Sequence, residues 1–190
     1  MTGRFGERHA ASAPSSTRDG AEIEPVPSLV FRVADVPDDM VTEILVPLDG
    51  SPLSRKALDV ALSENPDATV TVLHVIDPAE PGYSYYPFDS TAELDAEPRH
   101  GSAEWYEKAE AFADELFEDV RASAVEYDAD VETELAVGDP SRVIVDVADE
   151  RGFDHVILGS HGRDENSRVL VGSVTESVAY RSPVRVTLVR

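Results

Sequence analysis

The sequence predicts a single doubly wound α/β domain, in which a five-stranded parallel sheet of order 3-2-1-4-5 carries helices on both faces. Two observations predict this fold. From residue 42 onward, short apolar runs that fit buried strands alternate with longer stretches of helical period. Parallel strands also need crossover connections, which are right-handed. The alternation therefore favours a sheet whose winding reverses between its first and fourth strands.

The individual elements follow in order along the chain. The predicted strands are EILVPL at 43–48, TVTVLHVI at 69–76, the weaker VETELAV at 131–137, HVILGS at 155–160 and VRVTLVR at 184–190. The predicted helices lie between them, at 51–65, 103–127, 139–152 and 173–181. We expect Ser51 or Ser54 to cap the first helix, and Pro140 suits the first turn of the third. This order of elements is typical of a parallel sheet.

The segment 1–39 differs from the rest of the chain, because Gly, Ser, Pro and Arg are scattered through it without a sustained period. We expect a disordered N-terminal extension. For its apolar patch PSLVFRV, at 27–33, an added edge strand is the alternative. The domain is expected to occupy 40–190, since VTEILVPLDGS directly follows Met40. A further hypothesis is that Met40 is the biological start, which mass spectrometry of the native protein would test.

The charge balance describes the solvent more than the function. The 190 residues hold 16 Lys+Arg against 38 Asp+Glu, a formal net charge of −22. This balance excludes binding to nucleic acid or an anionic membrane by bulk attraction. Only Lys56 and Lys108 are lysines. A lysine-poor, carboxylate-rich surface is expected in a halophilic cytosol, where molar salt screens self-repulsion; an acidic mesophilic protein is the alternative.

Three absences from the sequence narrow the class of protein further. The chain has no cysteine, which excludes disulfides, thiolate zinc sites and cysteine nucleophiles. No apolar run approaches the length of a membrane span, and residues 1–30 lack the apolar core of a signal peptide. We therefore expect a cytoplasmic protein with neither nucleic acid nor membrane as partner.

The richest polar sequence follows the two strands at the predicted reversal point. Asp49 comes directly after the first strand, and the fourth strand continues as GSHGRDENSRVLVGS. Gly159 and Gly162 let main-chain N–H groups approach an anion closely, since no Cβ intervenes. Gly172 and Ser173 then open a helix, whose first N–H groups attract phosphate. The sequence predicts an anion cradle; glycines that serve only turns and caps are the alternative.

The spacing Gly-x2-Gly-x9-Gly-Ser resembles the universal stress protein family, whose nucleotide-binding members carry it after the fourth strand of a 3-2-1-4-5 sheet. The endings VPLDGS and LHVID match as well, and the resemblance covers nearly all of 40–190. It implies a regulatory stress-response protein that binds ATP, together with Mg²⁺ or Mn²⁺. It also implies a homodimer paired through the C-terminal strand and a client protein that the sequence does not identify.

The same resemblance implies a set of binding residues. Pro47 and Asp49 would lie near the nucleoside, and Val75 would contact adenine through its main chain. For Asp49, capping of the first helix is the alternative. The residues implied for the phosphates and ribose come from the end of the fourth strand and the start of the last helix: Gly159, Ser160, Gly162, Gly172, Ser173, Val174 and Thr175.

Two segments near this site have more than one interpretation. Asp164 and Glu165 depart from the neutral or basic residues of ATP-binding relatives, and they would weaken triphosphate binding unless they face solvent or share a divalent cation. Ordinary surface acidification is the alternative. The long connection 77–101 carries four aromatic residues, Tyr83, Tyr85, Tyr86 and Phe88. They either stack on a base or close as a lid over the crevice, or else they anchor an acidic excursion or form a dimer contact.

No residue is predicted to be catalytic. His161 is expected to be a solvent-facing loop residue, and the chain lacks the Gly-x4-Gly-Lys-Ser/Thr loop of dedicated nucleotide hydrolases. Slow ATP hydrolysis and a nucleotide-free dimeric interaction module are the two alternatives to a nucleotide-binding regulator.

Overall fold

The strands of the computed structural model, which describes residues 30–31, 42–79, 98–162 and 171–190, form one sheet of order β1-β6-β5-β2-β3-β4. The strands are β1 (Val30–Phe31), β2 (Glu43–Pro47), β3 (Thr69–Ile76), β4 (Val131–Val137), β5 (His155–Gly159) and β6 (Arg185–Val189). From β2 to β6 all pairings are parallel. These five strands have the predicted order 3-2-1-4-5 and lie within one residue of the predicted ends.

The sheet has one strand beyond the five predicted. β1 pairs antiparallel with the outer edge of β6, with Val30 opposite Thr187 and Phe31 opposite Val186. Of the two interpretations of the apolar patch at 27–33, the added edge strand is therefore found at these two residues. The rest of 1–39, for which we predict disorder, lies outside the described residues.

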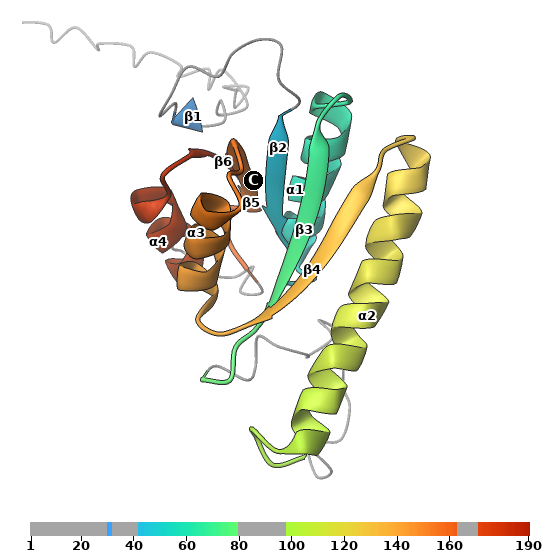
Figure 1. The fold of residues 1–190 in the computed structure, drawn as a ribbon, viewed down its shortest axis with the longest axis vertical. Coiled ribbons are helices and arrows are strands. Elements are labelled where there is room, and N and C mark those ends of the chain that lie inside the picture. The colour runs from blue at the N-terminus through green and yellow to red at the C-terminus, as the bar shows by residue number, and fades with distance from the viewer. Residues whose placement is uncertain (1–29, 32–41, 80–97, 163–170) are drawn as a thin grey trace, which may run out of the picture.

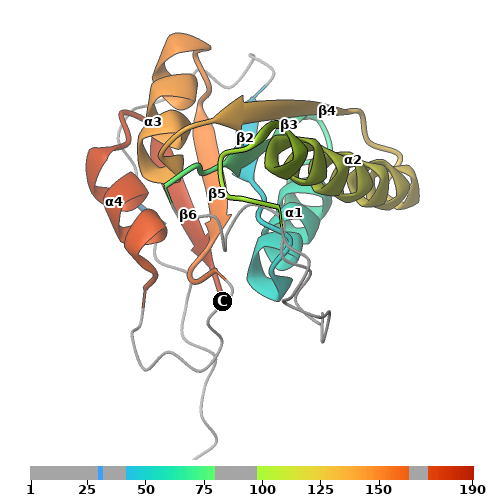
Figure 2. The ribbon, with the colours of Figure 1, turned by 90° about the horizontal axis from the view of Figure 1, so that it is seen from below.

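Two pairs of helices cover the sheet. The helices are α1 (Pro52–Glu64), α2 (Ala103–Glu126), α3 (Pro140–Glu150) and α4 (Ser173–Arg181). α1 and α2 cover one face, α3 and α4 cover the other, and α2 runs on past the carboxyl ends of the strands (Figures 1 and 2). Within the described ranges, no helix has the length and apolar character that a membrane span requires.

Side chains of alternate residues along the strands build the core on both faces. Ile44 and Val46 of β2 pack in the cluster beneath α1 and α2, whereas Leu45 packs in the cluster beneath α3 and α4. All three are fully buried. Full burial of such a side chain stabilises the fold by about 1.5–3 kcal/mol. Burial on both faces explains why these strands read as continuous apolar runs.

Candidate functional site

The candidate site lies where the central strands β2 and β5 end side by side. β2 ends at Pro47 and β5 at Gly159, and the two strands are hydrogen-bonded neighbours. The chain leaves β2 toward α1 on one face and leaves β5 toward α4 on the other face (Figure 2). This divergence at the carboxyl ends of two neighbouring strands is the predicted winding reversal.

The turn after β2 is held by Asp49. Its Oδ1 accepts a hydrogen bond from the Ser51 main-chain N–H at 3.0 Å, and the Ser51 hydroxyl accepts from the Ser54 N–H at 3.3 Å. Ser51 is therefore the N-cap of α1, and Asp49 orders the turn that precedes the cap. Gly50 has a φ of +81°, and a Cβ there would lie 3.3 Å from the ring of Phe112. Both the conformation and the close ring favour glycine.

The start of α4 is fastened to the end of β5 by backbone and hydroxyl groups. The Gly172 N–H donates to the Ser160 carbonyl at 2.8 Å, and the buried Thr175 hydroxyl donates to the Gly159 carbonyl at 2.9 Å. The Ser160 N–H in turn donates to the Val189 carbonyl of β6 at 2.8 Å. These bonds fix the α4 N-terminus against the carboxyl edge of the sheet.

The two halves of the site meet at Gly162. A Cβ on Gly162 would lie 3.0 Å from Oδ2 of Asp49, and one on Gly172 would lie 3.7 Å from the Gly162 main-chain nitrogen. The carboxylate at the end of β2 therefore lies against the glycine turn that follows β5. The structure brings together Asp49, Gly159, Ser160, Gly162, Gly172 and Thr175 of the predicted set.

The N-terminus of α4 has features suited to an anion. Gly172 is the N-cap residue and has no side chain to accept from the first-turn N–H groups. The next residue, Ser173, is exposed, and Val174 is half-buried. Uncapped N–H groups and the partial positive charge of a helix N-terminus together favour a phosphate.

Val75 and Pro47 lie on neighbouring strands of the same edge. Pro47 pairs with Leu73 in the parallel register, so Val75 lies two residues further toward the carboxyl end of β3. The residue is buried, with 8% of its surface exposed.

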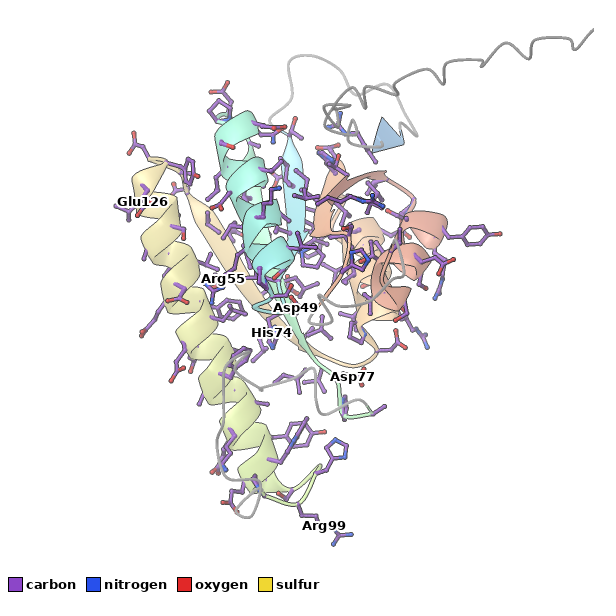
Figure 3. All side chains as sticks on the ribbon, turned by 180° about the vertical axis from the view of Figure 1, so that it is seen from behind. Asp49, Arg55, His74, Asp77, Arg99 and Glu126 are labelled. Atoms are coloured by element: carbon purple, nitrogen blue, oxygen red, sulfur yellow. The ribbon has the colours of Figure 1, made fainter. Side chains whose placement is uncertain are left out.

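His74 contacts the end of β2 and was not among the predicted site residues. The ring is buried, its Nδ1 lies 2.7 Å from the Leu48 carbonyl, and it packs edge-on against Phe112 of α2. The bond holds the carbonyl just before Asp49. Figure 3 shows Asp49 at the start of α1, with His74 and Asp77 following along β3 and its end. A polar residue within the apolar run TVTVLHVI was the available signal.

The remaining predicted residues have different outcomes. His161 is half-buried, and its Nδ1 lies 3.1 Å from the hydroxyl of the preceding, buried Ser160. Part of its surface is exposed, and its assignment as a loop residue without a catalytic role, in the turn after β5, stays a prediction. Four predicted features lie outside the described residues: Asp164, Glu165, and the aromatic residues at 83–88 with the surrounding connection 80–97.

Asp139 shows the capping role that Asp49 does not have. It follows β4 on the same edge of the sheet and is the N-cap of α3. A hydrogen bond from the Ser141 hydroxyl, at 2.6 Å, and one from the Arg142 main-chain N–H, at 2.9 Å, lower the pKa of the Asp139 carboxyl. Its oxygens are used to close the helix end.

The family model described as "Universal stress protein family" matches residues 40–190. The chain belongs to the universal stress protein family. Universal stress protein YxiE of Bacillus subtilis is 30% identical over 153 residues, which cover 80% of this chain and 100% of that protein. The structure of universal stress protein UspA from Lactobacillus plantarum superposes with a TM-score of 0.62 and 25% identity, covering 80% of this chain and 100% of that one.

Two further universal stress protein structures contain a ligand. One is a complex with cAMP, with a TM-score of 0.51 and 24% identity over 78% of this chain and 97% of that chain. The other, from Arabidopsis thaliana, has AMP bound, with a TM-score of 0.53 and 18% identity over 78% of this chain and 90% of that chain. Both share the fold of this universal stress protein.

Proposed function

We propose that this universal stress protein is a regulator that binds ATP at the carboxyl ends of β2 and β5. The observation that carries the proposal is the convergence of Asp49, Gly162 and Gly172 beside the N-terminus of α4. The neighbours described with cAMP and AMP support an adenine nucleotide as the ligand class.

In this proposal the phosphates lie against the turn from Gly159 to Gly162 and the first turn of α4. A side chain at Gly162 would crowd Asp49, and the N–H groups of α4 supply donors without a competing cap side chain. The exposed Ser173 hydroxyl adds a donor beside them. Thr175 acts indirectly, because its hydroxyl already donates to Gly159. Thr175 is thus a positioning residue of the cradle.

The nucleoside would lie toward β2 and β3, on the other side of the same edge. Asp49 supplies a carboxylate acceptor for ribose or adenine, next to Pro47. Because the side chain of Val75 is buried, we expect it to contact adenine through its carbonyl and N–H.

We also propose that Mg²⁺ or Mn²⁺ accompanies the phosphates. Such a cation typically binds phosphate oxygens, water and one or two carboxylates rather than a cage of protein ligands. Within the described residues no three His, Asp or Glu side chains are grouped to hold a metal ion.

For the setting, we propose a cytoplasm of high salt, two copies paired through β6 and a client protein that reads the nucleotide state. The net charge of −22 supports the high salt. The apolar character of β6 supports the pairing, since an apolar strand at the edge of a sheet favours association; the two residues of β1 cover part of that edge.

The first experiment is to purify the protein in molar KCl, denature it with acid and identify any released nucleotide by chromatography and mass. We expect adenine nucleotide in stoichiometric amount, and we expect added Mg-ATP to raise the melting temperature. A falling ratio of ATP to ADP during incubation would add slow hydrolysis. Absence of both released nucleotide and a melting shift would refute the proposal and favour a nucleotide-free module.

Substitutions at the α4 N-terminus locate the site. We expect Ser173→Glu to abolish the melting shift, because a carboxylate there repels phosphate. Ser63→Glu is the matched control, since Ser63 is also an exposed helical serine but lies near the opposite end of α1. Gly172→Val should also abolish binding, because its side chain would fill the proposed phosphate position. The protein should stay folded, because a Cβ there would meet its nearest neighbour at an ordinary contact distance of 3.5 Å. Equal ATP affinity of all four proteins would contradict the site.

A further inference from the structure

The outer edge of β6 is partly occupied by the chain's own β1. The pairing is antiparallel and involves two residues of β1, opposite Val186 and Thr187 of the five-residue strand β6. A two-residue strand contributes few hydrogen bonds. The outer edge of β6 therefore accepts an antiparallel partner, and in this structure that partner is the short strand β1.

Apolar surface continues to this edge on the face covered by α3 and α4. Val186 is buried in the cluster of that face, whereas Leu188, Val184 and Ala179 are only partly buried beside it. A partner at the β6 edge would therefore cover apolar side chains as well as main-chain groups.

A second copy of this chain fits that edge. Antiparallel pairing of two β6 strands about Thr187 would place Val186 of one copy opposite Leu188 of the other. Both residues belong to the same cluster, so both lie on the same face of the sheet. Such a pairing is isologous and closes as a two-fold dimer. It requires the positions on β6 that β1 occupies.

We propose that β1 is an internal cap that competes with a second copy of the chain for the outer edge of β6. The inference rests on the proposed pairing through β6 and does not depend on nucleotide binding. While β1 is paired the protein is monomeric, and displacement of β1 opens the edge to the dimer. The segment that precedes the domain thereby controls the oligomeric state.

The connection between β1 and β2 makes this competition concentration-dependent. β1 lies three strand positions from β2, a separation of about 14 Å at 4.8 Å per strand. Residues 32–42 span up to about 36 Å, which is ample. A tethered strand has an effective concentration on the order of millimolar. At micromolar protein the tether therefore favours the internal cap over an equally strong contact from a second copy.

The first test weakens the cap in the full chain. Val30→Pro with Phe31→Pro removes both main-chain N–H groups of β1. We expect sedimentation equilibrium in molar KCl to give a dimer dissociation constant at least tenfold below that of the wild type. Ala10→Pro with Ala11→Pro, outside β1 in the same N-terminal segment, is the control and should match the wild type. An unchanged dissociation constant in the β1 variant overturns the proposal.

The second test locks the cap. The chain has no cysteine, so Phe31→Cys with Val186→Cys introduces one pair at opposed positions. Position 186 faces position 188 in the proposed dimer, so this pair does not join two copies. Opposed residues of antiparallel strands have Cα atoms about 4.5–5.5 Å apart, which suits a disulfide. We expect an internal cross-link that keeps the protein monomeric at every concentration, and a dimer at high concentration after reduction. Failure to cross-link, or equal dimerisation of both forms, overturns the proposal.

Nucleotide content is measured on the same samples. A protein that releases nucleotide but whose uncapped form stays monomeric would refute the cap and leave the proposed nucleotide site intact. A protein that releases no nucleotide but dimerises when β1 is weakened would support the cap and count against the proposed nucleotide site.

Discussion

His155 makes the stability of this protein sensitive to acid at a position remote from the candidate site. It is the first residue of β5, is 6% exposed, and its Nε2 lies 2.8 Å from the Thr187 hydroxyl. Its Nδ1 has no hydrogen-bond partner among the described residues. Burial, with a smaller contribution from the neighbouring Arg185 charge, lowers the pKa of His155 from 6.5 to about 4.

The sign and size of the effect follow from this difference in pKa. Between pH 6.5 and 4 the unfolded chain binds a proton at His155 that the folded protein does not bind. The free energy of unfolding therefore falls as the pH falls, by up to about 1.4 kcal/mol per pH unit. At pH 4 the loss reaches about 3 kcal/mol, which is a large part of an ordinary domain's stability.

The assay compares denaturant unfolding of the wild type and His155→Gln from pH 8 to pH 4 in molar KCl. Glutamine keeps an amide nitrogen for Thr187 and does not titrate. The salt screens the many surface carboxylates, whose own titration both proteins share. We expect the two curves to converge in slope above pH 7 and to diverge by about 3 kcal/mol at pH 4. Parallel curves over the whole range would refute the argument.

Three other substitutions test the packing and the caps by denaturant unfolding. Gly159→Ala should destabilise the protein by about 1–3 kcal/mol, because its Cβ would lie 2.9 Å from the Leu53 main-chain carbon. Gly172→Ala should destabilise it by about 1 kcal/mol or less. Equal losses of stability would contradict the close approach at Gly159. Ser51→Ala should cost about 1 kcal/mol through loss of the α1 cap, and no loss would contradict that role. The exposed ion pair of Arg55 with Asp119 should show a coupling below about 1 kcal/mol in a double-mutant cycle, and a larger coupling in molar salt would be inconsistent with its exposure.

The arrangement of the sheet could be predicted from sequence because parallel strands buried on both faces read as unbroken apolar runs. The closeness of Asp49 to the glycine turn could be predicted because both follow strands of that sheet at its carboxyl edge; that the turn binds nucleotide stays a prediction. The N-cap residue of α1 could also be predicted from the sequence. Both Ser51 and Ser54 are good caps, but Pro52 suits the first helical position, so it selects Ser51.

Contacts between segments distant in the chain could not be predicted in this way. The bond between His74 and the Leu48 carbonyl depends on the register of β3 against β2. The closeness of Gly50 to Phe112 depends on where α2 crosses the sheet. The partner of β1 depends on which strand lies at the edge of the sheet, and the local hydrophobic period does not predict which strand that is.

The ring of Phe112 links the position of α2 to the proposed nucleotide site. It lies where a Cβ on Gly50 would be 3.3 Å away, and it packs edge-on against His74, which holds the Leu48 carbonyl. α2 therefore braces the turn that carries Asp49 from two directions. A client that shifts this long helix must disturb that turn, and a ligand that tightens the turn must resist the shift. Any such coupling is reciprocal. A client that binds the outer surface of α2 would therefore change the affinity of the site for its ligand, and the ligand would change the affinity for the client by the same factor.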